Sequence, residues 1–109
     1  MHELSIANSV VEICVEQANG ARVTRVTLEI GQLSAVMPDA IRFCFDVCAK
    51  DTAAEGATLE IVEMPGQARC LACGATLAIA VPYGQCDCGS ENLELVSGQQ
   101  LKIRQMEVV

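Results

Sequence analysis

Residues 70–89 read CLACGATLAIAVPYGQCDCG, and this stretch decides how the rest of the chain is divided. It holds two pairs of cysteines that stand twelve residues apart, and a glycine follows each pair. This spacing brings four thiolates to one point, where a zinc ion takes tetrahedral coordination. Glycine accepts the positive φ that turns backbone N–H groups toward the sulfurs. The sequence therefore predicts a structural zinc site formed by Cys70, Cys73, Cys86 and Cys88.

Three other interpretations of the cysteine motif stay open on the residues alone. The second arm is C-x-C, one residue shorter than the usual C-x-x-C, so Asp87 is an alternative ligand in place of one thiolate. A redox dithiol at Cys70 and Cys73 would lack the strand-to-helix context that such dithiols have. A catalytic zinc needs an open coordination position, which four thiolates would close.

The segment around the motif differs in character from the chain on either side. Pro65 and Gly66 precede it, and Gly98 follows it. Residues 67–97 have too few apolar side chains for a core of their own, so we expect them to fold on the metal. The sequence predicts a zinc-ribbon-like domain at 67–97, inserted into an α/β domain formed by residues 1–66 and 98–109.

The flanking segments predict an α+β domain with a small three-stranded sheet and two helices. Apolar residues recur at intervals of three and four across residues 4–18, which indicates an amphipathic helix that ends at Asn19 and Gly20. A second helix begins near Pro38, because proline fits a first helical turn. Its predicted apolar stripe comprises Ile41, Cys44, Phe45 and Cys48. With Cys14, these two cysteines are predicted to be core residues rather than ligands.

Three segments, 23–30, 58–64 and 101–108, have the composition of strands that together form the sheet. The first segment alternates apolar with polar residues and is predicted to be a half-buried strand. Its apolar residues are Val26, Leu28 and Ile30, and they alternate with Thr27 and Glu29. In the third, the apolar alternation changes face before Met106. A regular strand would not change face, so we expect a bulge near Gln105.

Composition narrows the class of protein. Hydrophobic residues make up 51% of the 109 residues, which is enough for a packed core. The formal net charge of −7 disfavours nucleic acid and acidic membrane surfaces as partners. No apolar run approaches the roughly 18 residues of a membrane span. The seven cysteines form an odd set with no export signal, which favours thiols in a reducing cytoplasm over disulfides.

The chain contains one histidine, His2, beside the terminal amine and Glu3. The amine and the imidazole both deprotonate around neutral pH, and they bracket the amide of His2. Ni²⁺ and Cu²⁺ favour such tetragonal nitrogen donors, and zinc seldom displaces an amide proton. Cytosolic copper is mostly monovalent, which leaves nickel. Met1, His2 and Glu3 are therefore candidate nickel ligands, and chance placement at a tolerant terminus is the alternative.

Four stretches resemble one family from end to end. They are MHELSIANSVVEI at the start, VTLEIGQLSAVMPDAIRFCFD in the middle, the C-x2-C…C-x-CGS motif and the closing LKIRQMEVV. The chain resembles the HypA/HybF nickel-incorporation proteins of [NiFe]-hydrogenase maturation. The resemblance implies a nickel metallochaperone with a separate structural zinc site. It implies nickel binding by the amino terminus, the next backbone amides and the His2 imidazole, with Glu3 also implicated.

The same resemblance implies two partners, a nickel-handling GTPase and the hydrogenase large subunit. No catalysis is expected, because one terminal histidine and a closed zinc site leave no nucleophile with a base. The alternative function is a zinc-ribbon module that binds only protein and has no role in nickel handling. The oligomeric state is left open.

Overall fold

The computed structural model describes residues 2–109, which form two compact units. Within the described chain, unit 1 comprises residues 2–29, 36–62 and 102–109. Unit 2 comprises residues 30–35 and 63–101. Unit 2 therefore contains the cysteine motif together with a short segment, 30–35, that lies far from the motif in the sequence.

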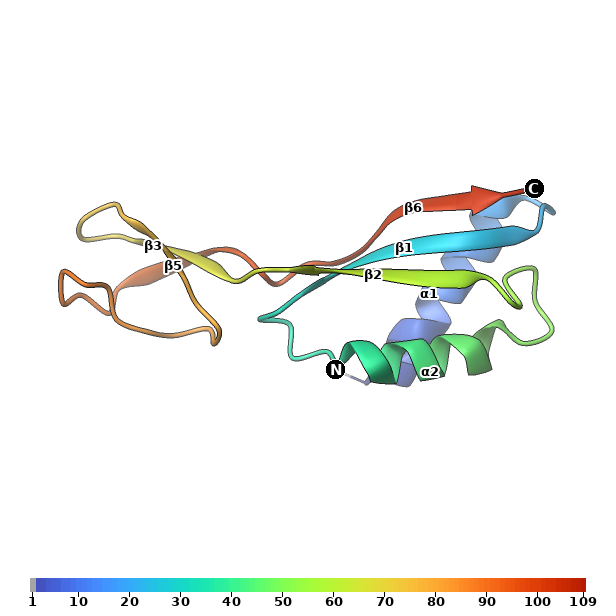
Figure 1. Ribbon diagram of the computed structural model, residues 1–109, viewed down its shortest axis with the longest axis horizontal. Coiled ribbons are helices and arrows are strands. Elements are labelled where there is room, and N and C mark those ends of the chain that lie inside the picture. Colours follow the sequence, from blue (N-terminus) through green and yellow to red (C-terminus); the bar gives the residue numbers. More distant parts are fainter. Residues whose placement is uncertain (1) are drawn as a thin grey trace. The chain divides into compact units, whose positions relative to one another are not determined.

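Unit 1 is built on a three-stranded sheet with two helices on one of its faces (Figure 1). Its elements are α1 (Glu3–Ala18), β1 (Val23–Gly31), α2 (Pro38–Ala49), β2 (Thr58–Met64) and β6 (Leu101–Val108), and the strand order is β2-β1-β6. This is the predicted α+β combination of two helices and three strands. Among the described residues, no helix has the length and apolar character needed to cross a membrane.

Helix α1 packs through most of the apolar face that its periodicity predicts, but Leu4, predicted on that face, is 47% exposed and Ile6 is buried. The buried residues of α1 are Ile6, Ala7, Val10, Val11, Cys14 and Ala18. The helix ends as expected, with Asn19 in the left-handed conformation at φ 50° and Gly20 at φ 92°. Asparagine and glycine tolerate this conformation at low cost, so the chain can turn directly into β1.

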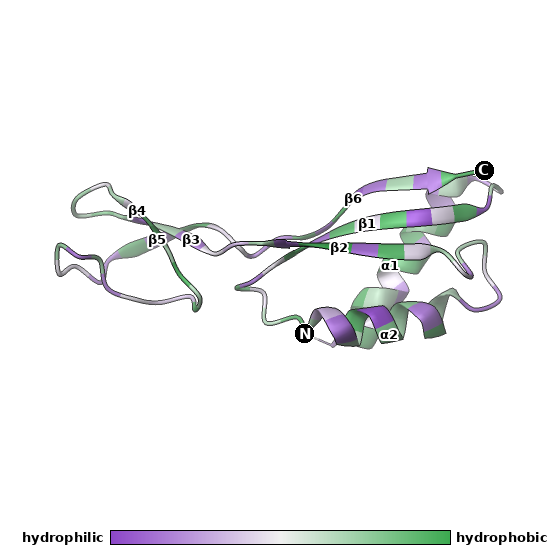
Figure 2. Ribbon diagram, in the orientation of Figure 1, coloured by the Kyte–Doolittle hydropathy of each residue, from purple (hydrophilic) through white to green (hydrophobic). Residues whose placement is uncertain are grey.

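Helix α2 begins at Pro38, as predicted, but its buried face differs from the prediction. Apolar and polar residues interleave along this helix (Figure 2). The buried residues are Ile41, Phe45 and Ala49. Cys44 and Cys48 are only half-buried, whereas Cys14 on α1 is buried. The prediction that all three are core residues is confirmed for Cys14 and wrong for the other two, which lie beside the buried stripe.

Strand β1 is buried on both faces from Val26 onward, so the prediction of a half-buried strand is wrong for this part. Thr27 is 4% exposed and Glu29 is 7% exposed. The reason is that β1 is the central strand, and long side chains of its neighbours cover its polar face. The Arg104 Nε donates a hydrogen bond of 2.8 Å to Glu29. This bond, with the charges of Lys102 and Arg104, lowers the pKa of Glu29 against the opposing effect of burial.

Strand β6 shows the change of face predicted near Gln105. Arg104 pairs with Glu29, and Glu107 pairs with Arg25, so both reach the same face of β1. Residues three apart on a regular strand would point to opposite faces. The alternation therefore changes between Arg104 and Glu107, as a bulge requires.

Unit 2 carries a second antiparallel sheet of short strands. Its strands are β3 (Gln67–Cys70), β4 (Thr76–Ala78) and β5 (Leu93–Ser97), in the order β4-β3-β5. At its centre Ala68 lies opposite Leu77 on one side and Leu95 on the other, and Ala68 is fully buried. These strands are too short for such a sheet to be stable by itself in water.

Three glycines of unit 2 let separate backbone segments touch. A Cβ added to Gly31 would collide with the carbonyl of Gly98, and one added to Gly98 would lie 2.6 Å from the Cα of Gly66. The Gly31 N–H donates to the Gln100 carbonyl at 2.6 Å, and the Leu33 N–H donates to the Gly98 carbonyl at 2.7 Å. These contacts make residues 30–35 part of unit 2.

We expect Gly98→Ala to destabilise the protein more than Gly20→Ala does. Both glycines have positive φ, so each substitution carries a backbone cost of about 1–2 kcal/mol. At Gly98 the new Cβ would also overlap the neighbouring backbone, which adds about 1–3 kcal/mol. At Gly20 nothing lies within 4 Å of the added atom. Chemical denaturation measures both variants, and equal losses of unfolding free energy would contradict the close backbone contact.

Candidate metal centres

The first cysteine pair lies at the end of strand β3, where the chain turns back into β4. The Gly74 N–H donates to the Cys70 carbonyl at 2.8 Å, and the Cys70 N–H donates to the Ala75 carbonyl at 2.8 Å. Gly74 has φ 79°, the positive value predicted for the residue after the pair. The turn therefore places the Cys70 and Cys73 side chains on the same side of the backbone.

The second pair is held by a similar turn despite its shorter spacing. The Gly89 N–H donates to the Cys86 carbonyl at 2.8 Å, and the Cys86 N–H donates to the Ser90 carbonyl at 2.9 Å. Gly89 has φ 94°, again as predicted. The Gln85 side-chain amide closes the turn through a 2.9 Å bond to the Gly89 carbonyl. The C-x-C spacing is thus compatible with a tight, hydrogen-bonded arm.

The two turns bring four sulfur atoms together. The Sγ atoms of Cys70, Cys73, Cys86 and Cys88 all lie within 4.8 Å of one another. Each close contact joins one arm to the other, at 3.6 Å between Cys70 and Cys88 and 3.6 Å between Cys73 and Cys86. A disulfide would need a separation of about 2.05 Å. Four zinc–sulfur bonds of about 2.3 Å in a tetrahedron place sulfurs about 3.8 Å apart, so the spacing fits a thiolate-bound zinc ion.

The backbone around the cluster favours negative sulfur. The N–H groups of Cys73 and Ala72 donate to Cys70, and with the neighbouring thiols they lower the pKa of Cys70 to about 6 against the effect of burial. The Ala75 N–H acts in the same direction on Cys73, but Cys86, Cys70 and burial outweigh it and raise the pKa of Cys73 to about 12. The Cys70 thiol therefore loses its proton readily, whereas the Cys73 thiol keeps its proton. A cation bound to the sulfurs would compensate the negative charge and allow further thiols to deprotonate.

Asp87 does not belong to this group of donors. The clustered ligand atoms are four sulfurs, and Asp87 lies between two of them in the sequence with an exposed side chain. Cys70 and Cys86 are buried while Cys73 and Cys88 are exposed, so one side of the cluster faces solvent. Four sulfurs complete a tetrahedral set without a carboxylate.

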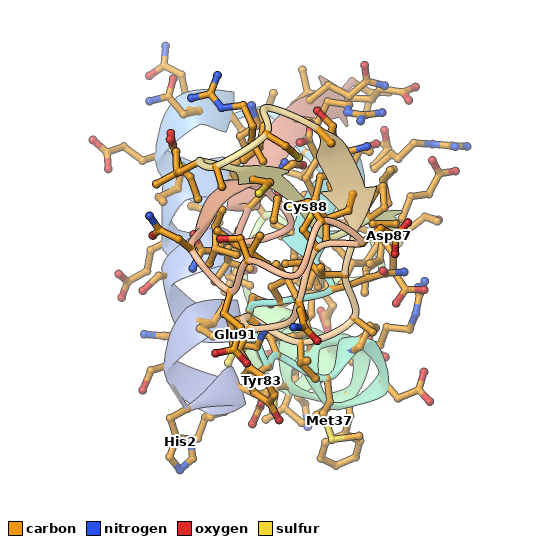
Figure 3. All side chains as sticks on the ribbon, turned by 90° about the vertical axis from the view of Figure 1, so that its left-hand side faces the viewer. His2, Met37, Tyr83, Asp87, Cys88 and Glu91 are labelled. Atoms are coloured by element: carbon orange, nitrogen blue, oxygen red, sulfur yellow. The ribbon has the colours of Figure 1, made fainter. Side chains whose placement is uncertain are left out.

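The N-terminal residues predicted to bind nickel lie at the start of α1. Met1 is outside the described residues. His2 is the N-cap of the helix, and its exposed imidazole projects beyond the first turn (Figure 3). The side chain of His2 makes no capping hydrogen bond. Glu3 is the first helical residue and is half-exposed.

The first amide N–H groups at this end take no part in helical hydrogen bonding. The Ile6 N–H donates to the His2 carbonyl at 3.2 Å. The amide N–H groups before Ile6 have no acceptor within the helix, which is the general state of a helix start. The amides of His2 and Glu3 can therefore lose a proton without breaking a helical hydrogen bond.

Comparison with known proteins identifies relatives along the whole chain. Residues 1–108 match the family model described as hydrogenase/urease nickel incorporation, metallochaperone, hypA. The hydrogenase maturation factor HypA of Trichormus variabilis is 56% identical over 108 residues, covering 99% of this chain and 96% of that protein. The HypA of Geobacter metallireducens is 49% identical over 109 residues, covering 99% of each chain.

Solved structures show the same fold. The solution structure of a HypA protein has a TM-score of 0.74 at 28% identity, covering 100% of this chain and 97% of that one. The solution structure of the Ni metallochaperone HypA from Helicobacter pylori has a TM-score of 0.72 at 27% identity, covering 100% and 98%. With the four-cysteine cluster and the full-length family match, these likenesses lead to one conclusion: the chain belongs to the HypA family of hydrogenase maturation factors.

Proposed function

We propose that the protein is a nickel metallochaperone that delivers Ni²⁺ for [NiFe]-hydrogenase maturation and uses no catalysis of its own. The nickel ligands are Met1, His2 and Glu3, and nickel is cargo rather than a resident cofactor. The observation that carries this proposal is the exposed His2 imidazole at the free start of α1. The family to which the chain belongs supports it.

The start of a helix suits a nickel ion bound by amide nitrogens. Ni²⁺ favours tetragonal nitrogen donors, and an amine, an amide and an imidazole supply them. A deprotonated amide carries negative charge, which the positive end of the helix dipole stabilises. The Glu3 carboxylate lies at the same end. Because the site is at a chain end, a partner can remove its ligands one at a time.

We propose zinc as the resident metal of unit 2, bound by Cys70, Cys73, Cys86 and Cys88. Zinc supplies the positive charge that allows four sulfurs to lie together as thiolates, and its closed sphere makes it structural. The nickel-binding domain is then 1–66 with 98–109, and the zinc-binding domain is 67–97. The contacts of residues 30–35 with unit 2 extend the part that depends on zinc.

The expected partners are a nickel-handling GTPase of hydrogenase maturation and the hydrogenase large subunit. The net charge of −7 gives no surface suited to nucleic acid, and the expected compartment is the cytoplasm, where free thiols persist. The second candidate is a zinc-ribbon interaction module without a nickel role. Its supporting observation is the exposed apolar side chains of Leu71, Tyr83 and Val96 in unit 2.

His2→Ala should abolish tight nickel binding and leave zinc and fold intact. An exposed imidazole contributes nothing to the core, so unfolding free energy should stay within about 0.5 kcal/mol. Loss of a direct ligand should weaken nickel binding by more than the roughly 10–100-fold typical of an outer partner. Isothermal titration of untagged protein measures the affinity. Asn8→Ala, an exposed change on the same helix, is the control. Unchanged nickel affinity in His2→Ala would exclude the terminal site and make the cysteines the candidate nickel ligands.

Extra residues before Met1 should also weaken nickel binding, because a peptide nitrogen is a poorer donor than an amine. Acidification should release nickel, because protons compete with the metal for its nitrogen ligands. Equilibrium dialysis across pH 5–8 tests this. Nickel that stays bound at pH 5, or that binds a tagged chain as tightly, would exclude an amine and imidazole site.

Cys88→Ala should lose about one zinc per chain and unfold unit 2. The reason is that metal binding supplies the folding energy of a segment with little core. Cys44→Ala is the matched control, because Cys44 is a half-exposed cysteine outside the cluster. Metal analysis of the purified variants gives the count. Full zinc in Cys88→Ala would point to Asp87 as the fourth ligand.

Chelation of zinc should collapse the amide spectrum of residues 63–101 while the signals of α1 and α2 stay dispersed. Unit 1 has its own aliphatic core, centred on side chains such as Leu28, Ile41 and Phe45. Residues 30–35 should lose dispersion with unit 2, because their backbone pairs with Gly98 and Gln100. Two-dimensional amide spectra before and after chelation provide the test. Simultaneous loss of every signal would show one cooperative unit.

A further inference from the structure

Two cysteines outside the four-sulfur cluster share one side of helix α2. Cys44 and Cys48 are four residues apart, which places them one above the other on a helix. Both are half-exposed, whereas Cys14, the remaining cysteine of unit 1, is 1% exposed. Solvent therefore reaches both thiols of α2, and neither is needed to fill the core formed by Ile41 and Phe45.

The side of α2 that carries these thiols approaches the first turn of α1. The Cys48 thiol lies 4.0 Å from the Leu4 carbonyl oxygen, which is a weak hydrogen bond. The exposed apolar side chains of Phe43 and Val47 flank the pair on α2. The thiols thus sit in a largely apolar and partly open setting.

The geometry of a helix lets one ion contact both sulfurs. Side chains at i and i+4 have Cβ atoms about 5–6 Å apart. Two metal–sulfur bonds of about 2.3 Å span about 4.6 Å when they lie in line. Two sulfur atoms attached to Cβ atoms at this separation can therefore lie about 4.6 Å apart, as a bridging ion requires.

The number of donors selects the kind of ion. Over residues 2–109, three or more His, Cys, Asp or Glu side chains gather only at the four-cysteine cluster, so no third ligand of these four types joins Cys44 and Cys48. Zinc takes four ligands, and divalent nickel takes a tetragonal set. Soft thiolates select monovalent copper. A closed-shell monovalent ion of this kind can have its coordination completed by two sulfur ligands.

We infer that Cys44 and Cys48 form a second thiol site in this protein, which binds one soft monovalent cation of the Cu⁺ class between two thiolates. Binding releases two protons, forms two metal–sulfur bonds and leaves the metal in its original oxidation state. The bound complex carries one negative charge. This site is separate from the proposed nickel and zinc sites and does not depend on either.

Electrostatics around the pair agrees with a cation-bridged site. Burial, and then the nearby charge of Cys44, raise the pKa of the Cys48 thiol. Without metal the Cys48 thiol is therefore held in its protonated form. A cation between them removes the repulsion that keeps the second proton in place.

The test is a titration of the zinc-loaded full chain with Cu⁺ under anaerobic conditions, in competition with a chromophoric Cu⁺ chelator. We expect one Cu⁺ per chain to be withdrawn from the chelator while zinc stays bound, as measured by metal analysis of the desalted protein. Cys44→Ser and Cys48→Ser should each weaken binding at least tenfold. In the parent chain, bound Cu⁺ should protect both residues from alkylation, as read by peptide mass spectrometry.

Val47→Ser is the matched control, because it places a hydroxyl at an exposed position of the same helix without removing a sulfur. It should bind Cu⁺ as the parent does. Circular dichroism and retained zinc show that each variant is folded. The inference is overturned if Cys44→Ser binds Cu⁺ as tightly as the parent. It is equally overturned if Cu⁺ displaces zinc while Cys44 and Cys48 remain open to alkylation.

Discussion

Four sulfur atoms packed at one point are the constraint on which unit 2 depends. At separations of 3.6 Å, thiolates repel one another unless a cation compensates their charge. The surrounding strands are three to five residues long and bury little apolar surface. Such strands cannot hold repelling charges together by packing alone. The turns at Gly74 and Gly89 orient the sulfurs, and the proposed zinc ion would supply the attraction that the small core lacks.

The proposed nickel site follows the opposite principle. A lasting metal site needs ligands fixed by surrounding structure, as the cysteine turns are by their backbone hydrogen bonds. His2 has neither a side-chain capping bond nor burial. Loose ligands give up a metal readily. One chain thus combines a site suited to retention with a site suited to transfer.

Local sequence patterns predicted the features that local physics controls. A few neighbouring residues determine where the helices begin and end, including the start of α2 at Pro38 and the end of α1 at Asn19. They also determine the positive φ of Gly74 and Gly89. The errors came from contacts between distant residues. Burial of Thr27 and Glu29 depends on side chains from β6, which are about 75 residues away in the chain. The half-exposure of Cys44 and Cys48 reflects how α2 is rotated against its partners, and periodicity alone leaves that rotation ambiguous by a residue. The grouping of 30–35 with the cysteine motif depends on a backbone contact at Gly31 that no pattern of side chains records.

The close contact of Gly31, Gly66 and Gly98 has a consequence for how such proteins diversify. An insert that is joined to the rest of a protein only through its two ends can be exchanged as a whole between related proteins. Unit 2 also takes in residues 30–35, which run directly into the start of α2 through Val36 and Met37. A transplanted zinc module would have to match this third segment as well as its own two ends. Residues 30–35 and 63–101 are therefore expected to change together during evolution, and recombination at the boundaries of the cysteine insert would separate backbone segments that contact one another.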